Sequence, residues 1–143
     1  MSEQENIQVI KNAMNDLNAR KLDTWEQYNT HDLLSYNPNS PEPMTGQQVL
    51  AMIGVFLAAF PDLHYDMERF IAQDDFVVLH WRYHGTHTGP MSAPGGKTIP
   101  PTGRHVMVSG CSTYQFKDGK VHRVWAYFDR AHLFGQLGLM PEM

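Results

Sequence analysis

Two segments within the first sixty positions repeat apolar residues with the period of an α-helix. One apolar stripe covers residues 7–17 and a second covers residues 49–60, and in both the apolar positions return after three or four residues. This spacing places the apolar side chains on one helix face, where they can cover a core. The sequence therefore predicts two amphipathic helices, the second ending before Pro61.

Three residue pairs have the form of a capping box, in which a first side chain accepts a backbone N–H while a residue three places on reaches back. They are Ser2 with Glu5, Asp23 with Glu26, and Thr45 with Gln48. We therefore expect helices to begin at all three pairs. Tyr36 follows the helix expected to begin at Asp23 and would lie at the mouth of a pocket; an exposed turn at Asn37-Pro38 is an equal alternative.

After the second stripe the pattern changes to the two-residue period of β-strands. Asp74-Asp75 is expected as a turn between residues 65–72 and 76–84, and Lys117-Asp118-Gly119-Lys120 as a tight hairpin between two later strands. Helices followed by four strands indicate an α+β fold, in which helices cover one face of a curved antiparallel sheet. We expect this sheet to enclose a pocket.

The connection between residues 85 and 104 is dense in glycine and proline. A loop of this length inside a compact domain more often serves function than not. We expect it to close over the mouth of the pocket and exclude water.

Length and composition indicate one globular domain over residues 1–143. Hydrophobic residues make up 42% and charged residues 18%, and the net charge is -4 with scattered basic residues. These values favour neither disorder nor nucleic-acid binding. Without a long apolar span or a secretory leader, the chain is expected to be cytoplasmic and to have no membrane partner.

Cysteine and histidine usage predicts neither a disulfide nor a metal site. Cys111 is the one cysteine and has no neighbouring base in the sequence, so we expect a buried structural thiol. His84 and His87 are three apart, but their segment is extended and turns at Gly85, so they need not converge. We expect no metal and no cofactor.

Residues 121–129 contain the strongest candidate for chemistry. Strand alternation puts Trp125, Tyr127 and Asp129 on one face. A carboxylate among apolar rings loses water, which makes its charged form costlier and suits it to proton transfer near neutral pH. The alternative is that Asp129 caps a short last helix, which stops before Gly138.

Further candidates for ligand binding lie on the strands. Trp125 and Tyr127 could fill the core or line the pocket, and alternation leaves both open. His80 and His105 are polar groups on strand faces that could hold a ligand. Trp81 occupies the opposite face from His80, and the pattern does not decide which of these faces meets the pocket.

Six short sequence motifs occur along the chain in a distinctive order. They are Phe60-Pro61-Asp62-Leu63, Trp81 with Gly85-Thr86-His87-Thr88-Gly89, Pro101-Thr102-Gly103-Arg104, Asp118-Gly119-Lys120, Trp125 through Asp129, and Gln136-Leu137-Gly138. Together they resemble the SnoaL-like polyketide cyclase family, also called ester cyclases, over residues 7–138.

The resemblance implies the cone-shaped α+β fold shared with ketosteroid isomerase, scytalone dehydratase and nuclear transport factor 2. It also implies a homodimer formed through the sheets and a cofactor-free intramolecular aldol closure. In the characterised cyclases a pocket aspartate is the acid/base, and the Trp-x-x-x-Asp segment makes Asp129 its match.

The leading hypothesis is a cyclase that acts on a small hydrophobic carbonyl compound or ester. Asp129 would remove an activated α-hydrogen, and a donor such as Tyr127 would help to stabilise the enolate. One alternative is a small-ligand-binding or dimeric interaction domain without chemistry. Another is a related isomerase, dehydratase or epoxide hydrolase on the same scaffold.

Overall fold

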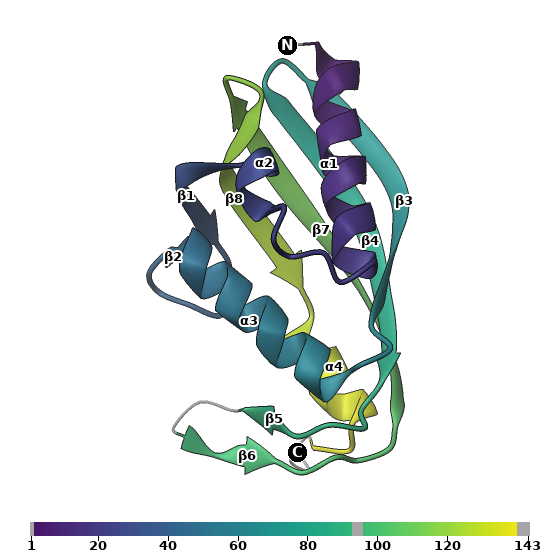
Figure 1. The fold of residues 1–143 in the computed structure, drawn as a ribbon. Helices are drawn as coiled ribbons and strands as arrows, with labels where there is room; N and C mark the ends of the chain where they lie inside the picture. The colour runs from purple at the N-terminus through teal and green to yellow at the C-terminus, as the bar shows by residue number, and fades with distance from the viewer. Residues whose placement is uncertain (1, 93–95, 140–143) are drawn as a thin grey trace.

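Helices and strands follow one another in this computed structural model, which describes residues 2–92 and 96–139. In chain order they are α1 (Glu3–Asn18), α2 (Trp25–Tyr28), β1 (Asn29–Tyr36), β2 (Met44–Thr45), α3 (Gly46–Ala59), β3 (His64–Gln73), β4 (Phe76–Thr86), β5 (Met91–Ser92), β6 (Thr98–Ile99), β7 (His105–Lys117), β8 (Lys120–Phe128) and α4 (Arg130–Gln136). Figure 1 shows α1 and α3 on the same side of a curved sheet. The α+β prediction is confirmed.

The main sheet has the strand order β2-β1-β8-β7-β4-β3. Its pairs are antiparallel except for β1 and β8, which run parallel. The sheet is therefore mixed: the four expected strands pair antiparallel, but β1 and β2 were not expected. The difference comes from β1, which adds a strand beside β8 before the second long helix begins.

The segment around β1 departs furthest from its prediction. Instead of a helix opened by Asp23, α2 is a single turn from Trp25, and its N-cap Thr24 makes no side-chain capping bond. Strand β1 then follows directly, with Leu33 and Ser35 buried on one face. Pairing with β8 explains this result, because the tertiary contact outweighs weak local helix signals.

The other two capping boxes are confirmed. Glu5 N donates to Ser2 Oγ at 3.1 Å while Ser2 N donates to Glu5 Oε1 at 3.2 Å. Gln48 N donates to Thr45 Oγ1 at 3.3 Å, and Thr45 N donates to Gln48 Oε1 at 2.9 Å. These bonds fix where α1 and α3 begin, and so where their apolar faces meet the sheet.

Both predicted hairpin turns are confirmed. Strands β3 and β4 are joined at Asp74-Asp75, and β7 and β8 at Asp118-Gly119. Asp118 and Gly119 both have positive φ, 52° and 80°, as a two-residue hairpin turn that follows the sheet's twist requires.

The core lies between the helices and the sheet face that they cover, which we call the inner face. Its fully buried members include Ile10, Leu33, Ala59, Phe60, Val77, Leu79, Val106 and Val108. The opposite, outer face carries the alternate residues of each strand. Within residues 2–92 and 96–139, no helix combines the length and apolar character needed to cross a bilayer.

The glycine- and proline-rich connection is anchored at its base rather than free. His87 is fully buried beside Phe60, and its backbone bonds to the far end of the connection, at Arg104 and Gly103. The Thr102 backbone N–H donates to His87 Nδ1 at 3.2 Å. Between these anchors, β5 and β6 form a small hairpin, and residues 93–95 of the connection lie outside the described residues.

Helix α4 begins directly after the end of β8. Asp129 caps it, and it ends at Gln136, before Gly138 as predicted. The Gln136 side chain accepts from Met107 N at 2.7 Å and donates to Met107 O at 2.8 Å. Met107 pairs with β4 on one side, and on the other side, beyond the end of β8, this amide makes the backbone bonds that a strand would make. It therefore holds α4 against β7.

Candidate substrate pocket

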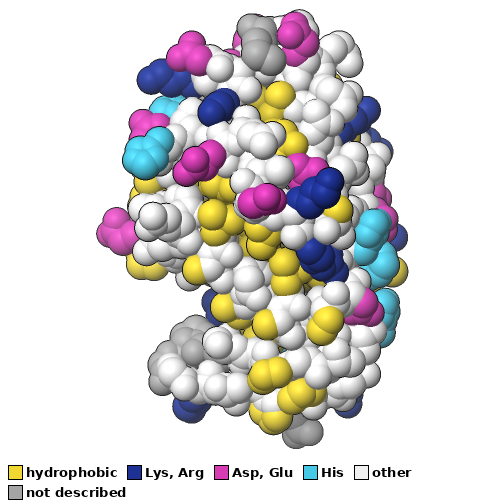
Figure 2. Space-filling model, in the orientation of Figure 1, with side chains coloured by type: hydrophobic (Ala, Val, Ile, Leu, Met, Phe, Trp, Pro, Cys, Tyr) yellow, Lys and Arg dark blue, Asp and Glu magenta, His cyan; other side chains and the backbone are white. Residues whose placement is uncertain are grey.

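A pocket of about 220 Å³ lies between the inner face of the sheet and helices α1, α2 and α3. Most of its lining is apolar, including Ile10, Met14, Leu17, Leu33, Val49, Met52, Ile53, Phe56, Val124, Ala126 and Phe128. On the face that carries α1 and α3, hydrophobic side chains form a strip bordered by acidic and basic groups (Figure 2). The volume is just below the ~300–1,000 Å³ typical of small-molecule sites, which favours a compact ligand.

Polar groups enter this apolar lining at a few positions. They are Lys21, Thr24, Tyr28, Asn29, Ser35, Tyr65, Tyr83, Ser112 and Tyr114, together with the indoles of Trp25 and Trp81. Among the described lining residues there is no Asp, Glu or His, and Lys21 is the one charged group. Apart from Lys21, the pocket therefore presents neutral hydrogen-bonding groups to a ligand.

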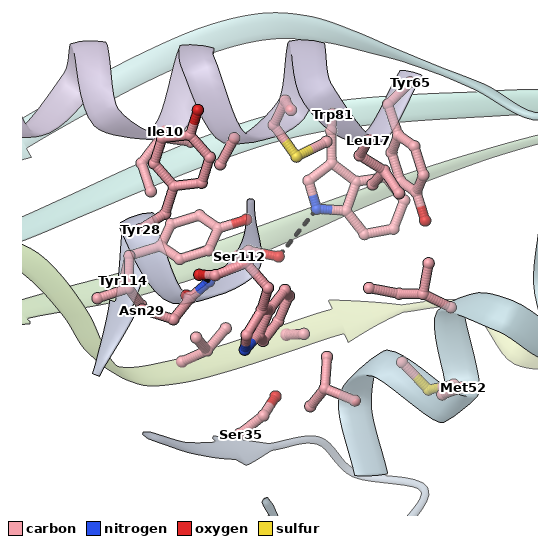
Figure 3. A pocket seen from close by; sticks show the side chains of 18 of the residues that line it. Ile10, Leu17, Tyr28, Asn29, Ser35, Met52, Tyr65, Trp81, Ser112 and Tyr114 are labelled. Atoms are coloured by element: carbon pink, nitrogen blue, oxygen red, sulfur yellow. Dashed lines mark hydrogen bonds between the residues drawn. The ribbon is translucent and has the colours of Figure 1, made fainter. Parts of the chain in front are cut away.

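Trp81 and Ser112 form a buried hydrogen bond in the pocket wall. The indole Nε1 donates to Ser112 Oγ at 2.9 Å, and the two residues are 7% and 5% exposed (Figure 3). They come from neighbouring strands β4 and β7. Trp81 also packs against Tyr65, with ring centroids 5.6 Å apart, so the indole is held in a fixed position.

Burial keeps three pocket tyrosines protonated. Loss of water raises the pKa of Tyr114 to about 12 and raises the pKa of Tyr65 and of Tyr83 still further. A phenol with such a pKa stays a hydrogen-bond donor at physiological pH and does not act as a base. The Tyr83 hydroxyl is fully buried and has no hydrogen-bond partner among the described residues.

The fourth pocket tyrosine is already engaged. The Tyr28 hydroxyl donates to Asp16 Oδ2 at 2.6 Å. This bond raises the pKa of Tyr28 and lowers the pKa of Asp16. Tyr28 therefore contributes its ring to the pocket while its hydroxyl ties α2 to α1.

Asp129 lies outside the described lining. Its side chain is exposed, and Oδ1 accepts the His132 backbone N–H at 2.9 Å at the start of α4. The capping interpretation is therefore confirmed, and the expected position among apolar rings is not what the structure shows. Its chain neighbour Phe128 is the last residue of β8 that lines the pocket.

The five predicted ligand-binding residues lie on the outer face of the sheet, away from the pocket. They are Tyr36, His80, His105, Trp125 and Tyr127, none of which lines the pocket. Trp125 stacks on Tyr36 with ring centroids 5.7 Å apart, and Tyr127 is 52% exposed. Alternation groups these residues correctly, but the pocket uses the other set, Val124, Ala126 and Phe128.

His80 and Tyr127 both line a second, shallow hollow on the outer face. His80 is paired with Cys111 on β7, and Cys111 with Tyr127 on β8, so the three stand in a row across the sheet. Beside them Arg82 Nε lies 3.4 Å from Glu68 Oε1. Cys111 is only half-buried, so the expectation of a buried structural thiol is wrong.

Neither the predicted lid nor a metal centre forms part of the described pocket. No described residue between Gly85 and Arg104 lines it. In the parts of the chain that the structure describes, no group of three or more His, Cys, Asp or Glu residues is arranged to hold a metal ion.

The pocket residues that the sequence analysis did not identify lie on the same strand face as buried apolar residues. Ser112 and Tyr114 have the same parity on β7 as the buried Val106 and Val108. Trp81 and Tyr83 likewise share parity with the buried Val77 and Leu79 on β4. The buried apolar residues at the N-terminal end of each strand could therefore have identified the inner face.

Comparisons with known proteins agree with this architecture. A model of the SnoaL-like polyketide cyclase family matches residues 8–137. No curated protein sequence matches the chain. Among solved structures, AclR from Streptomyces galilaeus, provisionally described as a hydroxylase, superposes with a TM-score of 0.84 at 24% identity, covering 98% of this chain and 100% of AclR.

Two further structures give the same picture. A provisionally assigned SnoaL-like polyketide cyclase from Jannaschia sp. CCS1 has a TM-score of 0.82 at 23% identity, covering 97% of this chain and 95% of its own. IdmH from Streptomyces antibioticus, provisionally a polyketide cyclase, has a TM-score of 0.79 at 22% identity, covering 93% and 98%. The architecture is the nuclear transport factor 2-like fold. The chain belongs to the SnoaL-like polyketide cyclase family.

Proposed function

We propose that the chain is a cyclase that binds a compact hydrophobic carbonyl compound or ester in the pocket and closes a ring by an intramolecular aldol reaction. The observation that carries this proposal is an apolar cavity whose polar lining consists largely of neutral donors. Such a cavity suits a ligand that is mostly hydrocarbon with one or two oxygen atoms.

The pocket would accelerate ring closure in two ways. Its walls would hold a flexible substrate folded, so that the two reacting carbons stay close. Its phenols would donate to the substrate oxygen on which negative charge develops. Because burial raises their pKa, these phenols remain donors at neutral pH.

The reaction also needs a group that moves a proton, and Asp129 is the proposed one. Its carboxylate would take an α-hydrogen, the enolate carbon would bond to a second carbonyl carbon, and the protonated carboxyl would return the proton to the new alkoxide. Product and substrate are then isomers. Asp129 directly follows the pocket residue Phe128, and the hydrogen bond by which it caps α4 is accepted by its Oδ1.

A second candidate is a binding protein that performs no chemistry. The observation that favours it is the lack of any carboxylate or imidazole among the described residues lining the pocket. Such a protein would bind the same class of compound and release it unchanged.

Turnover of a panel of aromatic and polyketide-like β-keto esters separates these candidates. The cyclase proposal predicts a product isomeric with its substrate for the wild type, and loss of that product for Asp129→Asn with binding retained. Asn also caps helices well, so this variant should stay folded. Full activity in Asp129→Asn would remove Asp129 from the mechanism, and binding without any product would favour the binding protein.

We also propose a homodimer formed through the outer face. Four large apolar side chains are exposed there, Ile71, Phe76, Met107 and Tyr127, and burying such a patch stabilises association. Light scattering should give the mass of a dimer for the wild type and of a monomer for Tyr127→Arg. A monomeric wild type would contradict this. A cytoplasmic location remains a prediction from the sequence.

A further inference from the structure

The Ser112 hydroxyl is oriented by its bond to Trp81. An indole N–H can only donate, and it occupies one lone pair of Ser112 Oγ at 2.9 Å. The hydrogen of the Ser112 hydroxyl must therefore point away from the indole. Trp81 thus fixes Ser112 as a donor within the pocket wall.

Tyr114 supplies a second donor beside the first. It lies two residues after Ser112 on β7, so both side chains face the pocket. In Figure 3 the Tyr114 phenol points toward Ser112. The proximity of Ser112 partly offsets the increase in the Tyr114 pKa that burial causes. Tyr114 still remains protonated, so both groups can donate to one acceptor.

The surroundings of these two donors are uncharged. Lys21, the one charged residue in the described lining, is in the segment between α1 and α2 and is exposed, whereas Ser112 is buried in the sheet. An ionised carboxylate placed between the two hydroxyls would lose its water without gaining a positive partner. A carbonyl oxygen loses far less on leaving water, and each donor can bond to one of its lone pairs.

We infer that Ser112 and Tyr114 form a subsite for a neutral carbonyl oxygen of the ligand, whose apolar body packs against Trp81 and the apolar residues of α3. This inference rests on the proposed function and narrows the ligand to an uncharged ketone or ester. It assigns Tyr114 as a residue that determines specificity, independently of whether any reaction follows.

Three naphthalene compounds of similar size test the subsite by isothermal titration calorimetry. They are 2-acetylnaphthalene, 2-ethylnaphthalene and 2-naphthoate. The wild type should bind the ketone about tenfold more tightly than the hydrocarbon, as expected for one net hydrogen bond. It should bind the carboxylate at least about tenfold more weakly than the ketone, because removing the charged carboxylate from water costs more free energy.

Tyr114→Phe is the informative variant, because it leaves the bond between Trp81 and Ser112 in place. It should bind the hydrocarbon as the wild type does and lose most of the preference for the ketone. Tyr28→Phe is the matched control: it removes another phenol from the same lining, but one already committed to Asp16. This control should keep the preference for the ketone.

The outcomes separate the inference from the function on which it rests. Equal binding of ketone and hydrocarbon by the wild type overturns the subsite and leaves a hydrophobic pocket in place. A ketone preference that survives in Tyr114→Phe also overturns it. Failure of all three compounds to bind overturns the proposed function, and the subsite with it.

Discussion

The indole ring of Trp81 occupies the space that a β-carbon at Gly110 would need. Such an atom would overlap with Cη2 and Cζ2 of the ring. The two residues face each other across β4 and β7. Glycine at position 110 therefore lets Trp81 lie across the sheet, where its N–H reaches Ser112.

Replacing this glycine should disturb both stability and binding. Gly110→Ala is expected to lower the free energy of unfolding by about 1–3 kcal/mol, the usual cost of overpacking an interior. Displacing Trp81 should also weaken binding of 2-acetylnaphthalene. Thermal melting and calorimetry measure the two effects.

A second glycine provides the control for that experiment. At Gly54 in α3 a β-carbon would meet nothing within 4 Å. Gly54→Ala should therefore raise the free energy of unfolding by up to about 1 kcal/mol, because alanine is the better helix former. If Gly110→Ala melts at the wild-type temperature, the close contact with Trp81 is not as described.

The capping role of Asp129 can be separated from its proposed chemistry. Asp129→Ala removes the acceptor for the His132 N–H and should cost about 1 kcal/mol of stability, whereas Asp129→Asn keeps an acceptor and should cost little. Urea denaturation measures both. If alanine is as stable as asparagine, the bond at the start of α4 contributes nothing.

His87 should make the protein less stable as the pH falls. Burial lowers its pKa from the ordinary 6.5. Its Nδ1 accepts from Thr102 N–H, so the neutral ring carries its proton on Nε2, which has no partner among the described residues. Below about pH 6.5 the unfolded chain binds a proton that the folded chain resists. Stability is therefore complete above that pH and declines below it.

Denaturant melts between pH 7.5 and 5 would measure this slope. His87→Asn should flatten it, at some loss of stability because the contact with Phe60 is removed. His31→Asn, a change at an exposed histidine, should leave the slope intact. An unchanged slope in His87→Asn would contradict the assignment.

Local signals in the sequence were sufficient for much of the fold. Capping boxes at Ser2 and Thr45 and the turn at Asp118-Gly119 depend on neighbours a few residues away, so they can be predicted without tertiary structure. Strand β1 could not be predicted in this way. Its pairing partner β8 is distant in the sequence, and that pairing decides its conformation.

The face of the sheet that lines the pocket could not be predicted, for a different reason. Alternation correctly separated Trp125 and Tyr127 from Val124 and Ala126, but it does not say which set meets the helices. A bulge adds to the difficulty, because the register of β7 and β8 shifts between Gln115 and Phe116. On β8 the large aromatic residues Trp125 and Tyr127 favoured one face as the pocket, whereas the helices cover the face that carries Val124 and Ala126.

Neighbouring residues on β8 allow the most direct test that the pocket on the inner face binds the ligand. Ala126 lines that pocket, and Tyr127 projects from the outer face. The measurement is the dissociation constant of 2-acetylnaphthalene for Ala126→Phe and Tyr127→Ala, each shown to be folded by circular dichroism. We predict that Ala126→Phe, which fills the cavity, weakens binding at least about tenfold, a loss of ~1.4 kcal/mol, while Tyr127→Ala binds as the wild type does. The reverse result, with binding lost only in Tyr127→Ala, would place the ligand on the outer face and contradict the account.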